Sequence, residues 1–283
     1  DPDMKDGYTV DHTALQNYLS FQYVPEPDTM CPDIKVLPAG HYAKVMCGEK
    51  LNPVRYVDYR FEPRPDISFD EKEKNLRRAL ENSIQAHMLS DVPVGSFLSS
   101  GIDSAVITAV ASKLCPGIKA FTISFGVKNY SEMDDASEIA KHLDIDHIKR
   151  VATFEDFVNA YEKVIYHLDS PVADPSTVAI YLICEEAAKH VKVVLSGEGS
   201  DELFAGYRVY GTVEAAQKIF ALPKPVKSVI KLFASALPES VRGKHMLMRG
   251  VTPIEDRFIG NAFIFDEKGK KKILKSYDPD VKF

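Results

Sequence analysis

The chain has 283 residues, of which 45% are hydrophobic and 27% charged, a composition typical of a globular protein rather than a disordered or fibrous one. No stretch approaches the roughly 18 to 20 consecutive apolar residues of a membrane span, and the acidic, polar start is unlike a signal peptide. The net charge of −6 and the scattered cysteines lead us to expect a cytoplasmic protein with reduced thiols that binds neither membranes nor nucleic acids.

Residues 1–62 predict little regular structure. Prolines recur between residues 25 and 53, where they oppose long helices and interrupt any sheet. Residues 11–19 predict one short helix, and residues 40–46 predict an extended segment. Because this region could bury little core by itself, we expect a linker or the end of a domain whose body is missing.

The pattern changes at residue 68, where a helical periodicity begins. Leu76, Leu80, Ile84 and Met88 recur at four-residue steps with charged residues between them. This spacing predicts an amphipathic helix with one face packed against apolar side chains.

Strands and helices then alternate along the chain. The sequence predicts strands at 92–98, 120–125, 145–151 and 191–195, and helices at 105–111, 136–143, 154–168 and 177–190. This alternation favours right-handed crossovers and an α/β fold with a doubly wound, mostly parallel sheet. Strand signals disappear beyond residue 211, so we expect a helical C-terminal portion.

The loop after the first of these strands contains small hydroxyl residues and a glycine. Unpaired backbone N–H groups at a helix start favour an anion, by about 0.3 to 1 kcal/mol at an exposed site, and Gly101 would let the backbone approach a phosphate closely. Asp103 would repel that phosphate unless a bound Mg²⁺ bridged the two. The alternative is that these residues only cap a helix and form a turn. Neither a GxxxxGK[ST] nor a GxGxxG motif occurs in the chain.

A second loop, residues 196–202, follows the strand at 191–195 and is crowded with acidic side chains. Glu198, Asp201 and Glu202 would repel one another unless a metal ion, an ammonium group or both neutralised them. A solvated acidic turn is the alternative. Because the carboxyl ends of parallel strands lie at one edge of a sheet, we expect the two loops to serve one site.

Both loops resemble motifs of known families. Ser99-x-Gly101-x-Asp103-Ser104 resembles the pyrophosphate loop of the ATP pyrophosphatase superfamily. Residues 195–207, LSGEGSDELFAGY, resemble the signature of the glutamine-hydrolysing asparagine synthetases, and residues 18–42 resemble the end of that family's glutaminase domain. The resemblance extends from about residue 11 to at least residue 210.

The resemblance implies an adenine nucleotide alpha hydrolase-like fold and a carbon–nitrogen ligase. ATP and Mg²⁺ would activate aspartate as β-aspartyl-AMP with release of pyrophosphate, and ammonia would displace AMP to give asparagine. The ammonia would come from glutamine hydrolysed in the protein's own glutaminase domain, and the protein could form a homodimer. Residues 1–62 would then be a remnant of that domain plus a linker, and residues 63–283 a C-terminally incomplete synthetase domain.

The resemblance also assigns roles to individual residues. The nucleotide and its pyrophosphate would be bound by Leu98, Ser99, Ser100, Gly101, Asp103, Ser104, Ile123, Ser196 and Gly197. The catalytic residues would be Asp103 and Asp201, as Mg²⁺ ligands, and Glu198, which would face the aspartyl substrate or the ammonia. Asp174 and Ser176 match a family segment that lines the acceptor site.

The chain departs from the family's pattern at three places. Ser100 stands where the commonest loop has glycine, which a serine can replace if its φ is negative. No cysteine lies near the first residue, where the family's glutaminase nucleophile stands, and the family's later basic segment has no match before Phe283. The lysine-rich run at 267–275 predicts a solvated helix face.

Two other functions remain open on this evidence. A related synthetase could adenylate a different carboxylate, as in β-lactam-forming or peptide-modifying enzymes. The chain could also be a nucleotide-binding module without turnover.

Overall fold

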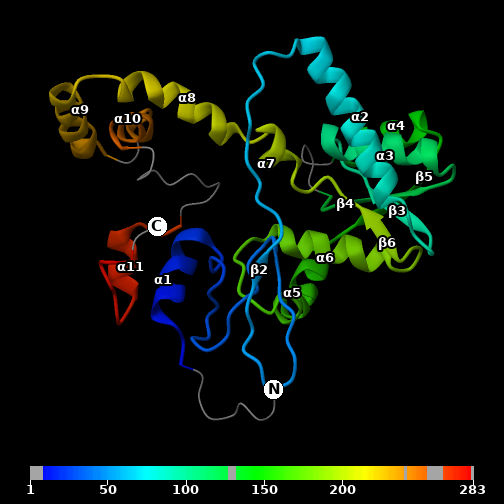
Figure 1. Cartoon of the computed structure of the whole chain (residues 1–283), viewed down its shortest axis with the longest axis horizontal. Helices are drawn as coiled ribbons and strands as arrows, with labels where there is room; N and C mark the ends of the chain where they lie inside the picture. Colours follow the sequence, from blue (N-terminus) through cyan, green and yellow to red (C-terminus); the bar gives the residue numbers. More distant parts are fainter. Residues whose placement is uncertain (1–8, 127–131, 239–240, 254–263, 282–283) are drawn as a thin grey trace. The chain divides into compact units, whose positions relative to one another are not determined.

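The computed structural model describes residues 9–126, 132–238, 241–253 and 264–281 (Figure 1). The strands are β1 (His41–Tyr42), β2 (Val54–Arg55), β3 (Val94–Phe97), β4 (Lys119–Ser124), β5 (Asp146–Val151) and β6 (Val193–Leu195). The helices are α1 (His12–Phe21), α2 (Phe69–His87), α3 (Ile102–Leu114), α4 (Met133–His142), α5 (Phe154–Leu168), α6 (Ser176–Ala187), α7 (Ser200–Phe204), α8 (Arg208–Phe220), α9 (Lys224–Ala236), α10 (Lys244–Val251) and α11 (Glu267–Ile273). No helix in these ranges is long and apolar enough to cross a bilayer.

The chain divides into two compact units. One contains Ala39–Asp169 and Ala173–Glu198, and the other combines the described residues up to Pro38 with Ser170–Val172 and those from Gly199 onward. We call the first the sheet unit and the second the helical unit. The boundary predicted near residue 62 stays a prediction.

The sheet unit is built on a four-stranded parallel sheet in the order β5-β4-β3-β6. Ser96 of the inner strand β3 pairs with Ala120 on one side and Leu195 on the other. The predicted alternation of strands and helices is confirmed, and so is the doubly wound parallel sheet. A short antiparallel pair, β1 and β2, precedes it.

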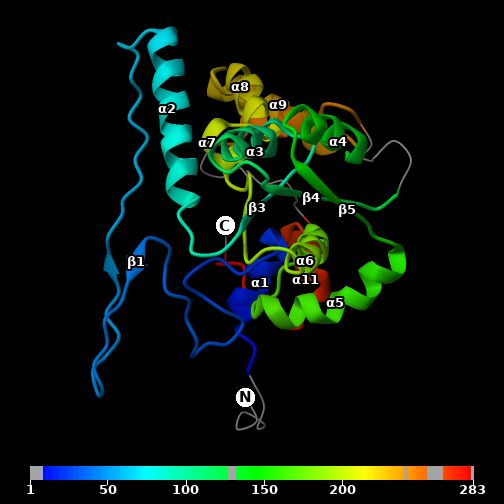
Figure 2. The same cartoon turned by 90° about the vertical axis from the view of Figure 1, so that its right-hand side faces the viewer.

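Helices cover both faces of this sheet (Figure 2). On one face, Ala120 packs with Leu98 and with the alanines of α4, while α3 and the end of α2 cover Val94 and Leu195. On the other face, Phe121 packs against α6, which α5 covers in turn. Burial on both faces suits the small and apolar residues of the inner strand β3, whereas the edge strand β5 carries polar residues and is more exposed.

The predicted amphipathic helix α2 buries less of its apolar face than expected. Ser68 caps its start by accepting a hydrogen bond from the backbone N–H of Glu71, 3.3 Å away. Ile84 near its end is 6% exposed and packs in the core of the sheet unit, whereas Leu76 is 44% exposed. The expectation of a continuous buried face was therefore wrong for the first half of the helix.

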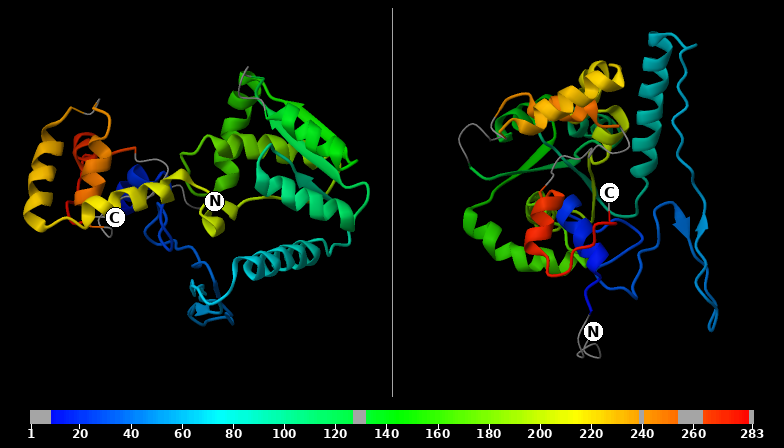
Figure 3. Two further views of the ribbon diagram at one scale, coloured as in Figure 1. Left: turned by 90° about the horizontal axis from the view of Figure 1, so that it is seen from above. Right: turned by 90° about the vertical axis from the view of Figure 1, so that its left-hand side faces the viewer.

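The helical unit contains two groups of packed helices (Figure 3). In the first, α8, α9 and α10 pack together, and Gly250 allows α10 to approach α8 because a Cβ there would lie 2.5 Å from Ile219 Cβ. In the second, Lys270 Nζ of α11 donates to Ser20 Oγ of α1 over 2.9 Å. Lys270 is 1% exposed and pairs with Glu267, so the predicted solvated face of the lysine-rich run is wrong at this residue.

Candidate active site

The first candidate loop begins where β3 leaves the sheet. The backbone N–H of Leu98 donates to the carbonyl of Phe121 over 2.9 Å, and the Thr122 hydroxyl donates to the carbonyl of Leu98 over 2.5 Å. The Leu98 side chain is 2% exposed and packs against Ala120 and α4. Leu98 is therefore buried, and both of its backbone groups are bonded to β4.

Two hydroxyl groups hold the shape of residues 99–104. Ser104 Oγ accepts a hydrogen bond from the Ser99 backbone N–H at 3.0 Å and lies 2.9 Å from Ser99 Oγ. Ser99 Oγ accepts from the Gly101 N–H at 3.1 Å, and Ser104 Oγ lies 3.1 Å from the Gly101 carbonyl. These bonds close the loop on itself, so its backbone is ordered by its own side chains.

Helix α3 starts from this loop without a side-chain cap. Gly101 is its N-cap residue, with φ −72° and ψ 146°, and no side chain bonds the N–H groups of the first turn. Those donors and the helix dipole favour an anion at this end. Ser100 is not among the described residues with positive φ, so serine fits the backbone here as predicted.

The second loop meets the first through a glycine. A Cβ on Gly197 would lie 3.2 Å from both the Asp103 Cβ and the Ser104 backbone nitrogen, a distance at which any side chain forces a shift. Just beside it, Ser196 Oγ accepts from the Glu198 N–H over 3.1 Å, and the Glu198 side chain is exposed. The expected meeting of the two loops is confirmed as far as residue 198.

The two predicted metal ligands belong to different units. Asp103 is exposed on the first turn of α3, and Asp201 is half-buried in α7, where Gly206 leaves room for its carboxylate. Neither has an ion-pair partner within the described ranges, and no three metal-ligating side chains gather there. Mg²⁺ is commonly held by one or two carboxylates together with phosphate oxygens and water, and the exposed carboxylate of Asp103 has the chemistry of such a ligand.

The remaining predicted residues are Ile123, Asp174 and Ser176, which lie in other segments of the chain than the two loops. Ile123 is half-buried and packs against the clusters that α5 and α6 form beneath the sheet. Asp174 accepts a hydrogen bond from the Ser176 N–H over 2.9 Å at the start of α6. Neither Ile123, Asp174 nor Ser176 has a hydrogen bond to either loop within the described residues. Asp174 thus has a helix-capping role that the sequence analysis missed.

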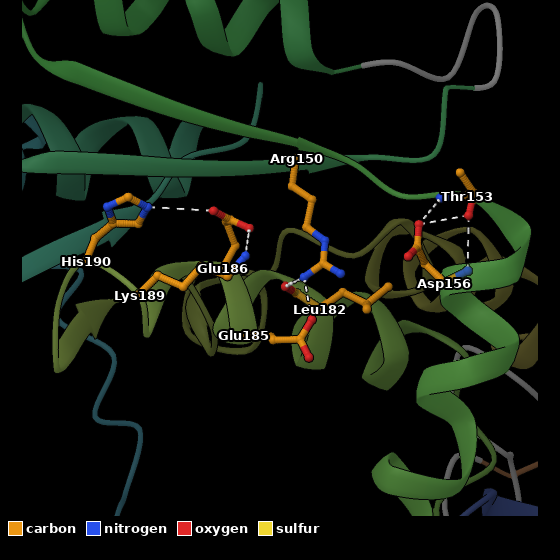
Figure 4. A network of polar contacts seen from close by, with 8 residues as sticks. All are labelled: Arg150, Thr153, Asp156, Leu182, Glu185, Glu186, Lys189 and His190. Atoms are coloured by element: carbon orange, nitrogen blue, oxygen red, sulfur yellow. Dashed lines mark hydrogen bonds and ion pairs between the residues drawn. The ribbon is translucent and has the colours of Figure 1, made fainter.

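A polar network on the lower face of the sheet is structural (Figure 4). Arg150 of β5 donates to the Leu182 carbonyl over 2.7 Å and pairs with Glu185 over 2.8 Å, joining the strand to α6. A hydrogen bond from Lys189 lowers the pKa of Glu186 below its usual value. These contacts hold α6 against the sheet and leave the loops at the strand ends free for a ligand.

Thr122 is the residue near the site that the sequence analysis overlooked. Its hydroxyl fixes the carbonyl at the base of the first loop. The sequence contained a signal for it: a polar residue in the middle of a strand predicted to be buried must find a hydrogen-bond partner.

Comparisons with known proteins agree with both motifs. The family model for asparagine synthase matches residues 75–257. The glutamine-hydrolysing asparagine synthetase 1 of Bacillus subtilis (strain 168) is 41% identical over 274 residues, which cover 97% of this chain and 43% of that protein. Asparagine synthetase B of Escherichia coli (strain K12) is 32% identical over 209 residues, 67% of this chain and 37% of that protein. The chain thus spans less than half the length of these relatives, and it belongs to the asparagine synthase family.

Proposed function

We propose that this chain carries the ATP-dependent synthetase activity of a glutamine-hydrolysing asparagine synthetase. The reaction would convert aspartate, ATP and ammonia into asparagine, AMP and pyrophosphate. The Bacillus subtilis relative, which is named for this activity, matches 97% of the chain. We include aspartate as the acceptor and glutamine as the nitrogen source in this proposal, since the chain spans 43% of that relative.

The observation that carries the proposal is the contact of Gly197 with the start of α3. The approach is so close that a Cβ added to Gly197 would lie 3.2 Å from both the Asp103 Cβ and the Ser104 backbone nitrogen. A helix N-terminus with free donors and an exposed carboxylate therefore face the same edge of the sheet. In open parallel sheets this edge is where nucleotides bind.

The chemistry requires two substitutions. A side-chain carboxylate oxygen of aspartate attacks the α-phosphorus of ATP, the bond to the β-phosphate oxygen breaks, and pyrophosphate leaves. Ammonia then attacks the acyl carbon of the β-aspartyl-AMP, the bond from that carbon to the AMP oxygen breaks, and the nitrogen loses a proton. Both steps develop charge that fixed donors stabilise.

The residues of the two loops suit these steps. Ser99, Ser100, Gly101 and Ser104 would bind the pyrophosphate portion of ATP at the uncapped start of α3, with the hydrogen bonds among them holding the loop in shape. Asp103 and Asp201 would hold Mg²⁺, which supplies positive charge that neutralises the phosphate oxygens. Glu198, exposed next to Gly197, would orient the ammonia and accept its proton.

The other assigned residues complete the proposed site. Leu98, Ile123, Ser196 and Gly197 would contact the nucleoside, and Asp174 and Ser176 would line the acceptor pocket. Residues 1–62 would come from the end of a glutaminase domain, and residues 63–283 would form most of the synthetase domain. We place the whole protein in the cytoplasm, as a possible homodimer that receives ammonia from its own glutaminase domain.

The test is product analysis with the full-length protein. Mg-ATP, aspartate and an ammonium salt should yield AMP, pyrophosphate and asparagine in equal amounts. Release of ADP instead would contradict the proposal. Pyrophosphate release that needs another carboxylate and no ammonia would assign the chain to a related synthetase with a different acceptor.

A further inference from the structure

The base of the first loop is held by a hydrogen-bonded pair of side chains from two neighbouring strands. Thr122 of β4 lies between the Leu98 carbonyl, 2.5 Å from its hydroxyl, and the His147 Nε2 of β5, 2.7 Å away. Ala120, two residues before Thr122, pairs with His147 in the sheet, so both side chains lie on the face that α4 covers. Thr122 is 3% exposed and His147 is half-buried, so the contact is partly buried.

The direction of the protons follows from the chemistry of the three groups. A carbonyl oxygen only accepts, so the single Thr122 proton must point to Leu98. Thr122 Oγ1 then has only lone pairs to offer, and His147 Nε2 must be the donor. His147 is thereby fixed as the tautomer protonated on Nε2.

The other ring nitrogen supports the same assignment. His147 Nδ1 is buried and has no hydrogen-bond partner within the described residues. Protonation there would bury an unpaired N–H, which is unfavourable. Burial, with a smaller contribution from Lys149, lowers the pKa of His147 below its usual value, so the ring is neutral at pH 7.

We propose that His147 is a positioning residue that acts through Thr122 to fix the backbone from which the pyrophosphate loop starts. This inference rests on the proposed function, because it assumes that residues 99–104 bind ATP. The Leu98 carbonyl lies immediately before the Ser99 amide. Two hydrogen bonds orient the peptide unit between Leu98 and Ser99: one from the Thr122 hydroxyl to its carbonyl and one from its own N–H to Ser104 Oγ.

The loop downstream has its own bonds but depends on this base. Ser99 and Ser104 link the loop to α3, while Leu98 links it to the sheet. If the Leu98 carbonyl lost its donor, the peptide between Leu98 and Ser99 could rotate, and the Ser99 N–H would no longer meet Ser104 Oγ. Hydrogen exchange at the Ser99 and Gly101 amides should therefore report whether Thr122 and His147 hold the base of the loop.

The experiment uses four test substitutions and one control in the full-length protein. His147→Ala removes the donor, and His147→Gln keeps a side-chain N–H at a similar distance from the backbone. Thr122→Val removes the hydroxyl with little change in volume, and Thr122→Ser restores it. His142→Ala, at the exposed end of α4, is the matched control.

The first readout is amide hydrogen exchange without nucleotide. We expect the Ser99 and Gly101 amides to exchange about 10-fold faster in His147→Ala and Thr122→Val, corresponding to one lost hydrogen bond. Exchange should return to within about twofold of the unsubstituted protein in His147→Gln and Thr122→Ser. The amides of α6 should be unaffected in all variants, which separates loop positioning from general loss of stability.

The second readout is steady-state kinetics of pyrophosphate release. The KM for ATP should rise about 5- to 10-fold in His147→Ala, with the KM for aspartate unchanged, and His147→Gln should restore it.

Loop exchange that stays unchanged in folded His147→Ala overturns the inference, as does equal behaviour of His147→Ala and His147→Gln. If Thr122→Val does not fold, the two His147 variants decide. Absence of pyrophosphate release from the unsubstituted protein contradicts the proposed function, while the exchange comparison still tests the positioning role.

Discussion

The loops that follow β3 and β6 reach the same edge of the sheet but are held there in different ways. The loop after β3 is braced by hydroxyl groups of its own, because Ser99 and Ser104 bond to each other and to backbone groups between them. The loop after β6 has the bond from Glu198 to Ser196, and its backbone lies against the first loop at Gly197.

The first loop is thus preorganised by its own hydrogen bonds, whereas the second is placed by docking against the first. A loop closed by its own hydrogen bonds keeps its donors in place before a ligand arrives, which lowers the entropic cost of binding. A loop placed by close contact depends on the shape of its neighbour. Changes in the first loop should therefore disturb both loops, and changes in the second should disturb only its own position.

The largest effect is expected for Asp103→Ala. Alanine keeps the Cβ that faces Gly197, so the two loops should stay docked while the carboxylate is lost. If that carboxylate holds Mg²⁺ against the phosphates, kcat for pyrophosphate release should fall by roughly 100-fold or more. Thermal unfolding should change little, because Asp103 is exposed and has no ion pair within the described chain.

Asp134→Ala is the matched control for this change. Asp134 is also an exposed aspartate in the first turn of a helix, α4, but belongs to neither loop. It should keep kcat within about twofold of the unsubstituted protein. Equal activity in the two variants would remove Asp103 from the site.

Gly197→Ala should have the next largest effect, because it breaks the docking directly. The new Cβ would lie 3.2 Å from the Asp103 Cβ and the Ser104 nitrogen, neither of which is the end of a flexible side chain. The loops must separate by a few tenths of an ångström, and kcat/KM for ATP should fall about 10- to 50-fold. Steady-state kinetics measures this effect.

Gly211→Ala separates docking from the general consequences of replacing glycine. Gly211 lies in α8, has no atom within 4 Å of an added Cβ, and does not have a positive φ. Alanine there should raise stability slightly and leave the kinetics unchanged. Gly197→Ala kinetics as mild as those of Gly211→Ala would mean that the close approach has no role.

Local features of both loops could be predicted from the sequence, because they depend on residues near one another in the chain. The hydroxyl residues and Gly101 follow a strand within a few positions, and this order alone indicates a turn at a helix start. The same holds for Ser196 and Glu198. The sheet that carries both loops followed from the strand and helix periodicities.

Features that depend on distant residues could not be predicted in this way. The contact of Thr122 with His147 requires the pairing of β4 with β5 in one register, which a single sequence does not specify. Lys270 is buried because Ser20, which is 250 residues away in the chain, lies beside it. Leu76 follows the helical periodicity but lies where no apolar partner covers it.

Ser104→Ala should weaken the brace of the first loop and have a smaller kinetic effect than the changes above. It removes the acceptor for the Ser99 N–H and the partner of the Ser99 hydroxyl in a position that is 8% exposed. Loss of these bonds should cost about 1 to 2 kcal/mol of unfolding free energy and raise the KM for ATP about 5- to 10-fold. Urea denaturation and kinetics measure the two effects.

Ser112→Ala is the control, since this serine of α3 bonds only to the Ala109 carbonyl of its own helix. Its stability should change by no more than about 0.5 kcal/mol. If Ser104→Ala matched it in both measurements, the first loop would not be braced by its hydroxyl groups.

Ser196→Ala should have the smallest effect, because the loop after β6 depends little on its own hydrogen bonds. The bond from the Glu198 N–H to Ser196 Oγ is exposed, and water can replace it when the hydroxyl is removed. Stability should fall by about 0.5 kcal/mol or less, and the midpoint of thermal unfolding by about 1 to 2 °C. A loss as large as that of Ser104→Ala would show that the second loop is also braced from within. A tenfold rise in the KM for ATP at unchanged stability would show that the proposed nucleotide contact of Ser196 is made by its hydroxyl, leaving the docking at Gly197 as what holds the loop.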